Sequence, residues 1–145
     1  MLHASLLLAW HVVPDTERGR SDRMEPKDLN LLTPEVAAAS ISDREIVLPY
    51  ELALEAIDML GTGGYAVVSW EGWLLFQDGS MGHSFQHQGT VGLERYPDES
   101  AQEFIARASI FVRQTMEQSQ LEWNRKPTRA NARLYCCLAI EPCND

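Results

Sequence analysis

The sequence lacks most of the patterns that identify an enzyme or a membrane protein. It contains no Gly-x-Ser-x-Gly nucleophile elbow, no phosphate-binding loop and no glycine pattern typical of dinucleotide binding. Its longest apolar runs fall well short of the roughly 20 residues needed to span a bilayer. We therefore expect no membrane contact and no cofactor, and the sequence favours a role other than catalysis without deciding it.

Cysteine is scarce, and basic residues are outnumbered. The three cysteines are odd in number, and Cys136 and Cys137 are adjacent, so no disulfide framework is indicated and a cytoplasmic setting is the simpler inference. Their spacing also differs from that of zinc sites, so we expect no metal. Lys and Arg number 12 against 21 Asp and Glu, which leaves a formal net charge of -9. This charge disfavours nucleic acid and favours a basic protein partner.

The first 23 residues differ in composition from the rest of the chain. The apolar run from Leu6 to Val13 leads into a polar segment that carries arginines. No Lys or Arg precedes the run and no small-residue cleavage site follows it, so it does not fit a secretory signal. We expect the native protein to begin at Met24 and residues 1–23 to be an upstream extension with little structure. Residues 24–145 are long enough to form a single domain with its own core.

An amphipathic helix is predicted from Pro49 to about Gly61. Its apolar residues recur at helical spacing, whereas Glu51, Glu55 and Asp58 fall on the opposite side. These three carboxylates form an acidic ridge, which is either a solvated surface or a surface that meets a basic partner.

Further elements follow from capping and periodicity. Thr33-Pro34-Glu35 predicts the start of a short helix, and Ser100 followed by Glu103 has the spacing of a capping box. The expected elements are a short helix over 36–40, an extended segment over 44–48, a short strand over 90–96, a long helix from 100 to about 123, and a strand over 134–140. Cys136 is expected in the core and Cys137 on the other face of that last strand.

The stretch Tyr65–His87 predicts a central β-hairpin. Asp78-Gly79 fits a two-residue type I′ turn, which would pair Phe76 with Met81 and place His83 and His87 on the core-facing side. A bulge at Gly72 or Gly82 would change this, because a one-residue slip turns every later side chain to the other face. The register therefore decides whether the two histidines share a surface with Glu71.

Two tryptophans of this hairpin point to opposite faces. The apolar parity comprises Ala66, Val68, Trp70, Leu74 and Phe76, and the mixed parity comprises Ser69, Glu71, Trp73 and Gln77. An exposed Trp73 beside Glu71 would have the composition of a binding hot spot. The alternative is that Trp73 is covered, either by the N-terminal segment or by the partner in a homodimer.

The succession LALEAIDML, a glycine break and YAVVSWEGW resembles the helix-then-strand opening of small bacterial immunity proteins from polymorphic toxin systems, in particular the immunity protein forty family. The resemblance covers roughly Pro49 to Asp78. In this chain Trp70-Glu71-Gly72-Trp73 stands where a glycine-rich acidic motif is expected. The resemblance implies a cytoplasmic, non-enzymatic protein that neutralises a toxin by covering its active site.

The order of these elements predicts an α+β domain, with a mainly antiparallel sheet of about four strands and two principal helices on one face. The first functional hypothesis is a small acidic protein-binding module that uses a surface made of Glu71, Trp73, Glu51, Glu55 and Asp58. The second is a small enzyme or ligand-binding protein in which His83, His87 and Glu71 line a pocket beside the hairpin.

Overall fold

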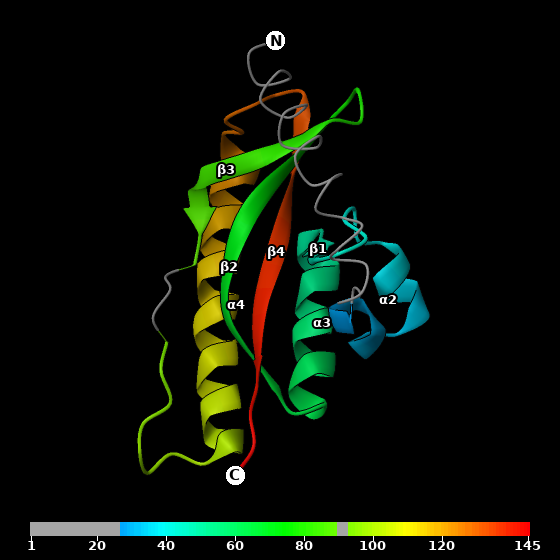
Figure 1. Cartoon of the computed structure of the whole chain (residues 1–145). Coiled ribbons are helices and arrows are strands. Elements are labelled where there is room, and N and C mark those ends of the chain that lie inside the picture. The colour runs from blue at the N-terminus through cyan, green and yellow to red at the C-terminus, as the bar shows by residue number, and fades with distance from the viewer. Residues whose placement is uncertain (1–26, 90–92) are drawn as a thin grey trace.

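The computed structural model of the chain describes residues 27–89 and 93–145 (Figure 1). In this part of the chain four strands form one sheet in the order β1-β4-β2-β3, and every neighbouring pair is antiparallel. The strands are β1 (Ile46–Leu48), β2 (Tyr65–Phe76), β3 (Met81–Gln88) and β4 (Ala132–Pro142). The predicted α+β class and the antiparallel sheet are confirmed.

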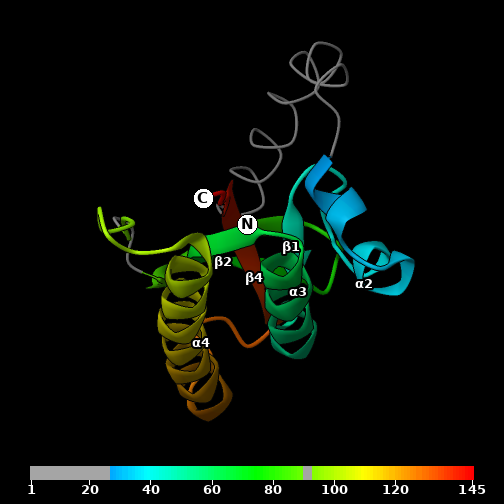
Figure 2. The ribbon, with the colours of Figure 1, turned by 90° about the horizontal axis from the view of Figure 1, so that it is seen from below.

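The two long helices lie on the same face of this sheet, as predicted (Figure 2). They are α3 (Tyr50–Thr62) and α4 (Ala101–Arg125), and two shorter helices, η1 (Lys27–Leu31) and α2 (Pro34–Ala38), precede them. The predicted capping box at the start of α4 is present, since Ser100 and Glu103 bond each other's backbone amides. Thr33 likewise caps α2 through its side-chain oxygen.

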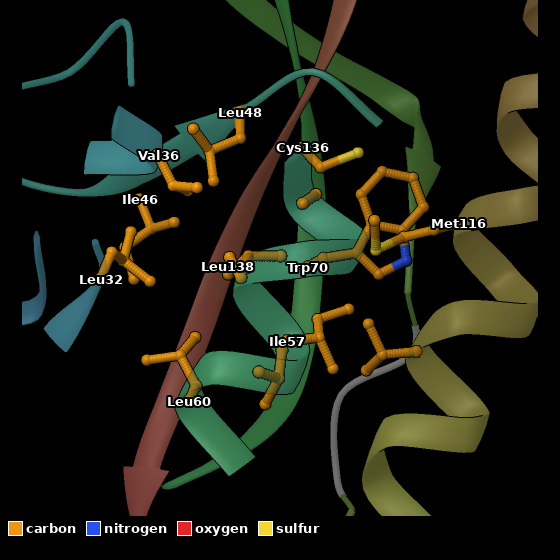
Figure 3. Packing of buried hydrophobic residues seen from close by; sticks show 14 residues of the cluster. Leu32, Val36, Ile46, Leu48, Ile57, Leu60, Trp70, Met116, Cys136 and Leu138 are labelled. Carbon is orange, nitrogen blue, oxygen red and sulfur yellow. The ribbon is translucent and has the colours of Figure 1, made fainter. Parts of the chain in front are cut away.

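The main core lies between the sheet and these helices. Trp70 of β2 is 2% exposed and packs in one cluster with Ile57 of α3 and Met116 of α4 (Figure 3). Its indole N–H donates to Thr115 Oγ1 at 2.8 Å, so the one polar atom of the ring is satisfied inside the core. The assignment of Trp70, Leu74 and Phe76 to the core is confirmed.

Several predicted bounds differ from the structure by one or two residues, among them those of α2, which is Pro34–Ala38 where a helix over 36–40 was expected. Helix α3 continues through Gly61 to Thr62, and Gly63 caps it. Of the strand predicted over 90–96, residues 93–96 are not in a strand and residues 90–92 lie outside the described residues. The expectation for residues 1–23 also falls outside them.

The turn of the hairpin is one residue longer than predicted. Phe76 and Ser80 pair across it, with the Phe76 amide donating to the Ser80 carbonyl at 2.9 Å, so the loop contains Gln77, Asp78 and Gly79. Gly79 has a φ of 89°, and the Asp78 carboxylate accepts from the Ser80 amide at 2.9 Å. The expected two-residue turn is therefore wrong, and the pairs from Leu75–Met81 to Gly72–Ser84 are each shifted by one residue.

Candidate functional site

The sheet has a second apolar layer on the face opposite α3 and α4, which we call the far face. Alternation along the strands places Val47, Trp73, Tyr135 and Cys137 there, and they form one cluster in which each side chain is at most 6% exposed. Cys136 and Cys137 lie on opposite faces, as predicted, since Cys136 belongs to the helix-side core.

Trp73 belongs to this layer and is not an exposed hot spot. It is 2% exposed, although its parity is the predicted one. Of the two alternatives drawn from the sequence, burial is the correct one. Trp73 therefore contributes packing, and a partner cannot contact its ring without a rearrangement of the face.

A small cluster of polar and aromatic side chains borders the far face on β2 and β3, and we call it the rim cluster: Glu71, His83 and Phe85. His83 pairs with Trp73 in the ladder, so the one-residue shift at the turn puts its ring on the far face. His83 Nδ1 lies 3.5 Å from Glu71 Oε1, and its ring stacks on Phe85 with centroids 5.9 Å apart. Phe85 is 79% exposed.

His87 lies on the other side of the sheet. The register jumps between Gly72, paired with Ser84, and Glu71, paired with Gln88, so β3 bulges at this point. The bulge turns His87 toward the helix side, where its ring meets the edge of Trp123 and its Nδ1 shares a 2.8 Å hydrogen bond with Ser84. Burial lowers the pKa of His87, which favours the neutral ring.

Gly72 makes this bulge possible. A Cβ at Gly72 would stand 2.8 Å from the His87 carbonyl oxygen, so only glycine admits the β3 backbone this closely. Gly72 was one of the two predicted bulge positions, whereas Gly82 pairs regularly with Leu74. The predicted pocket of His83, His87 and Glu71 is therefore wrong, because the structure joins only His83 and Glu71.

A concavity of about 450 Å³ opens beside Glu71 on the far face. Asp28, Glu45, Glu71 and Cys137 are among its lining residues. Cys137 Sγ donates to Glu45 Oε2 at 3.6 Å, and burial, with the nearby Glu45 charge, raises the pKa of the Cys137 thiol. Burial also raises the pKa of Glu45. A thiol held in its protonated form is a poor nucleophile, so these groups do not make a cysteine-type catalytic site.

The acidic ridge of α3 faces away from the rim cluster. Glu51, Glu55 and Asp58 are exposed on a helix that covers the opposite side of the sheet from Glu71 (Figure 2). Arg113 of α4 makes an ion pair with Asp58 and donates to the Leu54 carbonyl at 3.2 Å. The five residues predicted as one binding surface are thus divided between two sides of the molecule, and the ridge contains a cation that the sequence did not reveal.

Sequence reasoning missed Phe85 and Glu45. Phe85 lies two positions after His83 in β3, so the sequence predicts that the two side chains share a face. The exposure of the Phe85 ring could not be predicted, because the register of β3 changes at the bulge that follows. Glu45 precedes β1, and it approaches Cys137 only because β1 pairs with β4.

Within residues 27–89 and 93–145, no group of three or more His, Cys, Asp or Glu side chains is placed to hold a metal ion. The same part of the chain contains no helix that is both long enough and apolar enough to cross a membrane. Comparison with known proteins found no matching family model, no matching curated protein and no matching solved structure.

Proposed function

We propose that this protein is a small acidic protein-binding module, and that the rim cluster is the centre of its binding surface. The observation that carries the proposal is an exposed phenylalanine, Phe85, beside His83, whose Nδ1 lies 3.5 Å from the Glu71 carboxylate. Exposed aromatic rings next to charged groups are the side chains that dominate binding energies at protein interfaces.

The charge of the protein supports a basic partner. The formal net charge is -9, and Glu71 shares its concavity with Asp28 and Glu45. The negative charge would attract a partner that has lysine or arginine at its contact surface. The carboxylates would then fix the orientation of the bound partner. Glu51 and Glu55 lie on α3, on the helix side of the sheet and away from the rim cluster. In this proposal they raise the association rate and make no contact with the partner at the rim cluster.

The resemblance to immunity proteins supports a more specific form of the proposal. In that form the partner is a toxin, and this protein neutralises it by covering the active site. A surface with one exposed aromatic anchor surrounded by carboxylates suits such steric cover, because it needs no catalytic group of its own.

The proposal is tested by placing a photo-crosslinking phenylalanine analogue at position 85 of the full chain in cells of the native host. The matched control carries the analogue at Ile110, which is 58% exposed on α4. We expect an adduct with one basic protein from position 85 and not from position 110. With that protein purified, Phe85→Ala and Glu71→Lys should each weaken binding by at least about tenfold, as loss of a hot-spot contact does.

Both substitutions should leave the fold intact, because the two side chains lie at the border of the far face. The free energy of unfolding of Phe85→Ala should stay within about 0.5 kcal/mol of the wild-type value. Adducts of equal yield at positions 85 and 110, or full affinity of both variants for the crosslinked protein, would rule out the rim cluster as the binding surface.

A further inference from the structure

The far face raises a question that the proposed function leaves open, namely what covers it. Val47, Trp73, Tyr135 and Cys137 are at most 6% exposed, yet among the described residues both long helices lie on the other face. The described hydrophobic side chains packed against this cluster are Ile41, Leu75 and Met81. A sheet face this apolar is stable only when another layer is packed on it.

The described part of the chain begins at the border of this face. Asp28, in η1, lines the same concavity as Glu71, Cys137 and Ala139, all of which belong to the far face. Twenty-six residues precede Lys27 in the sequence. Thirteen of them separate Val13 from Lys27 and span at most about 45 Å when extended. Four strands at a spacing of about 4.8 Å are only about 15 Å across, so Leu6–Val13 can reach every part of the face.

The composition of the N-terminal apolar run suits the far face. The run Leu6–Val13 reads LLLAWHVV and contains a single polar residue, His11, which suits a surface made of a tryptophan, a tyrosine and a valine. The segment 14–26 that links this run to η1 carries three arginines and four acidic residues, so the match between segment and face is apolar and does not depend on net charge. Burial of the apolar run against the apolar cluster would remove both from water, which is favourable.

We propose that the far face is a docking surface for the chain's own N-terminal segment, with Leu6–Val13 as the occupant of the cluster around Trp73 and Tyr135. The segment then serves as the missing second layer of the sheet, and the rim cluster stays outside it. This inference does not depend on the identity of any partner. It differs from the expectation that residues 1–23 have little structure, and one experiment decides between them.

The two adjacent cysteines give the readout, because they report on opposite faces. The full chain and a chain that begins at Met24 are treated with iodoacetamide under native conditions, and alkylation is followed at each cysteine by peptide mass spectrometry. In the shorter chain Cys137 should react at least about tenfold faster than in the full chain, because uncovering a thiol restores reagent access and lowers its raised pKa. Cys136, 1% exposed beneath the helices, should react at the same rate in both.

Full-length variants keep the test decisive if the shorter chain unfolds, which rapid alkylation of Cys136 would reveal. Leu8→Asp places a charge within the docking run and should speed alkylation of Cys137 alone, whereas the control Asp15→Asn, outside the run, should not. Equal Cys137 rates in the full chain, the folded shorter chain and the Leu8→Asp variant would overturn the proposal. A Cys137 rate that rises when the full chain is diluted would also overturn it, since the cover would then be a second copy of the protein.

Discussion

The two faces of the sheet differ in kind, although the same strands build both. On the helix side, β2 contributes Trp70 to the core cluster with α3 and α4, and it contributes Leu74 and Phe76 to a second cluster around Trp123 of α4. On the far face, it contributes Trp73 and Leu75 to a smaller apolar layer and Glu71 to the border of that layer, where Glu71 lies beside His83. One face therefore determines the fold, while the other combines packing with the side chains that are able to recognise a partner.

A buried tryptophan does not by itself show which role a face of the sheet has. Trp70 and Trp73 are equally buried, at 2% exposure, in different surroundings. Trp70 has an internal hydrogen-bond partner and two helices around it, whereas Trp73 packs against strands and a titratable ring, His83. Neither tryptophan is exposed, whereas Phe85 at the edge of the far face is.

The largest expected effect comes from truncating the two tryptophans. Trp70→Ala should lower the free energy of unfolding by about 3–5 kcal/mol, because it removes a large buried ring from the core. Trp73→Ala should cost a similar amount in the full chain, because its ring is just as buried. Urea unfolding followed by circular dichroism measures both.

Repeating the two substitutions in the chain that begins at Met24 sharpens the comparison. The cost of Trp70→Ala should be the same in both chains, whereas the cost of Trp73→Ala should fall once its cover is removed. A Trp73→Ala cost below about 0.5 kcal/mol in the full chain would show that this side chain has no core role, since that is the range of ordinary surface substitutions.

An intermediate effect is expected from adding one methyl group at the bulge that separates the histidines. Gly72→Ala should destabilise the protein by about 1–3 kcal/mol, because its Cβ would overlap the His87 carbonyl oxygen and crowd Leu134. Gly79→Ala is the matched control: it has open space around it but a φ of 89°, so strain alone should cost about 1 kcal/mol.

Chemical shifts of the His87 ring, measured by NMR, would show whether Gly72→Ala also moves the bulge. The ring should lose the shift caused by the nearby Trp123, while Gly79→Ala should preserve it. Unchanged stability and unchanged His87 shifts in Gly72→Ala would show that the bulge does not require glycine.

The smallest expected effect is on the pH dependence of the free energy of unfolding. It distinguishes His87 on the helix side from His83 on the far face. Burial lowers the pKa of His87 below its ordinary value of 6.5. The unfolded chain therefore binds the proton first, so the stability contributed by neutral His87 is present above about pH 6.5 and is lost as the pH falls through the lowered pKa.

Urea unfolding at a series of pH values between 7.5 and 5 measures this loss. Relative to wild type, His87→Gln should show a shallower decline of stability below about pH 6.5, while the His83→Gln control retains His87 and should keep the decline. Identical pH profiles for wild type and His87→Gln would show that His87 is protonated as readily in the folded chain as in the unfolded one.

Much of the fold was predictable because it depends on local patterns. The capping box at Ser100 predicted the start of α4, and strict alternation over β4 separated Cys136 from Cys137. The site was less predictable, because its errors arose partly from the local geometry of one turn and partly from contacts between distant segments. Asp78 bonds Ser80 and lengthens the turn, which moves His83 by one register position. Arg113 reaches Asp58 from another helix, although the two are far apart in sequence.

The sequence by itself determined most of the element types, the α+β class, the acidic charge and the opposite facing of Trp70 from Trp73 and of Cys136 from Cys137, because these depend on neighbours within a few positions. Only the tertiary structure decided the register of the hairpin, the separation of His83 from His87, the burial of Trp73 and the division of the carboxylates between two sides. The physical reason is that strand pairing and helix packing join residues remote in the chain. A single extra residue in a turn, or a single missing Cβ at Gly72, is enough to reassign a side chain from one face to the other.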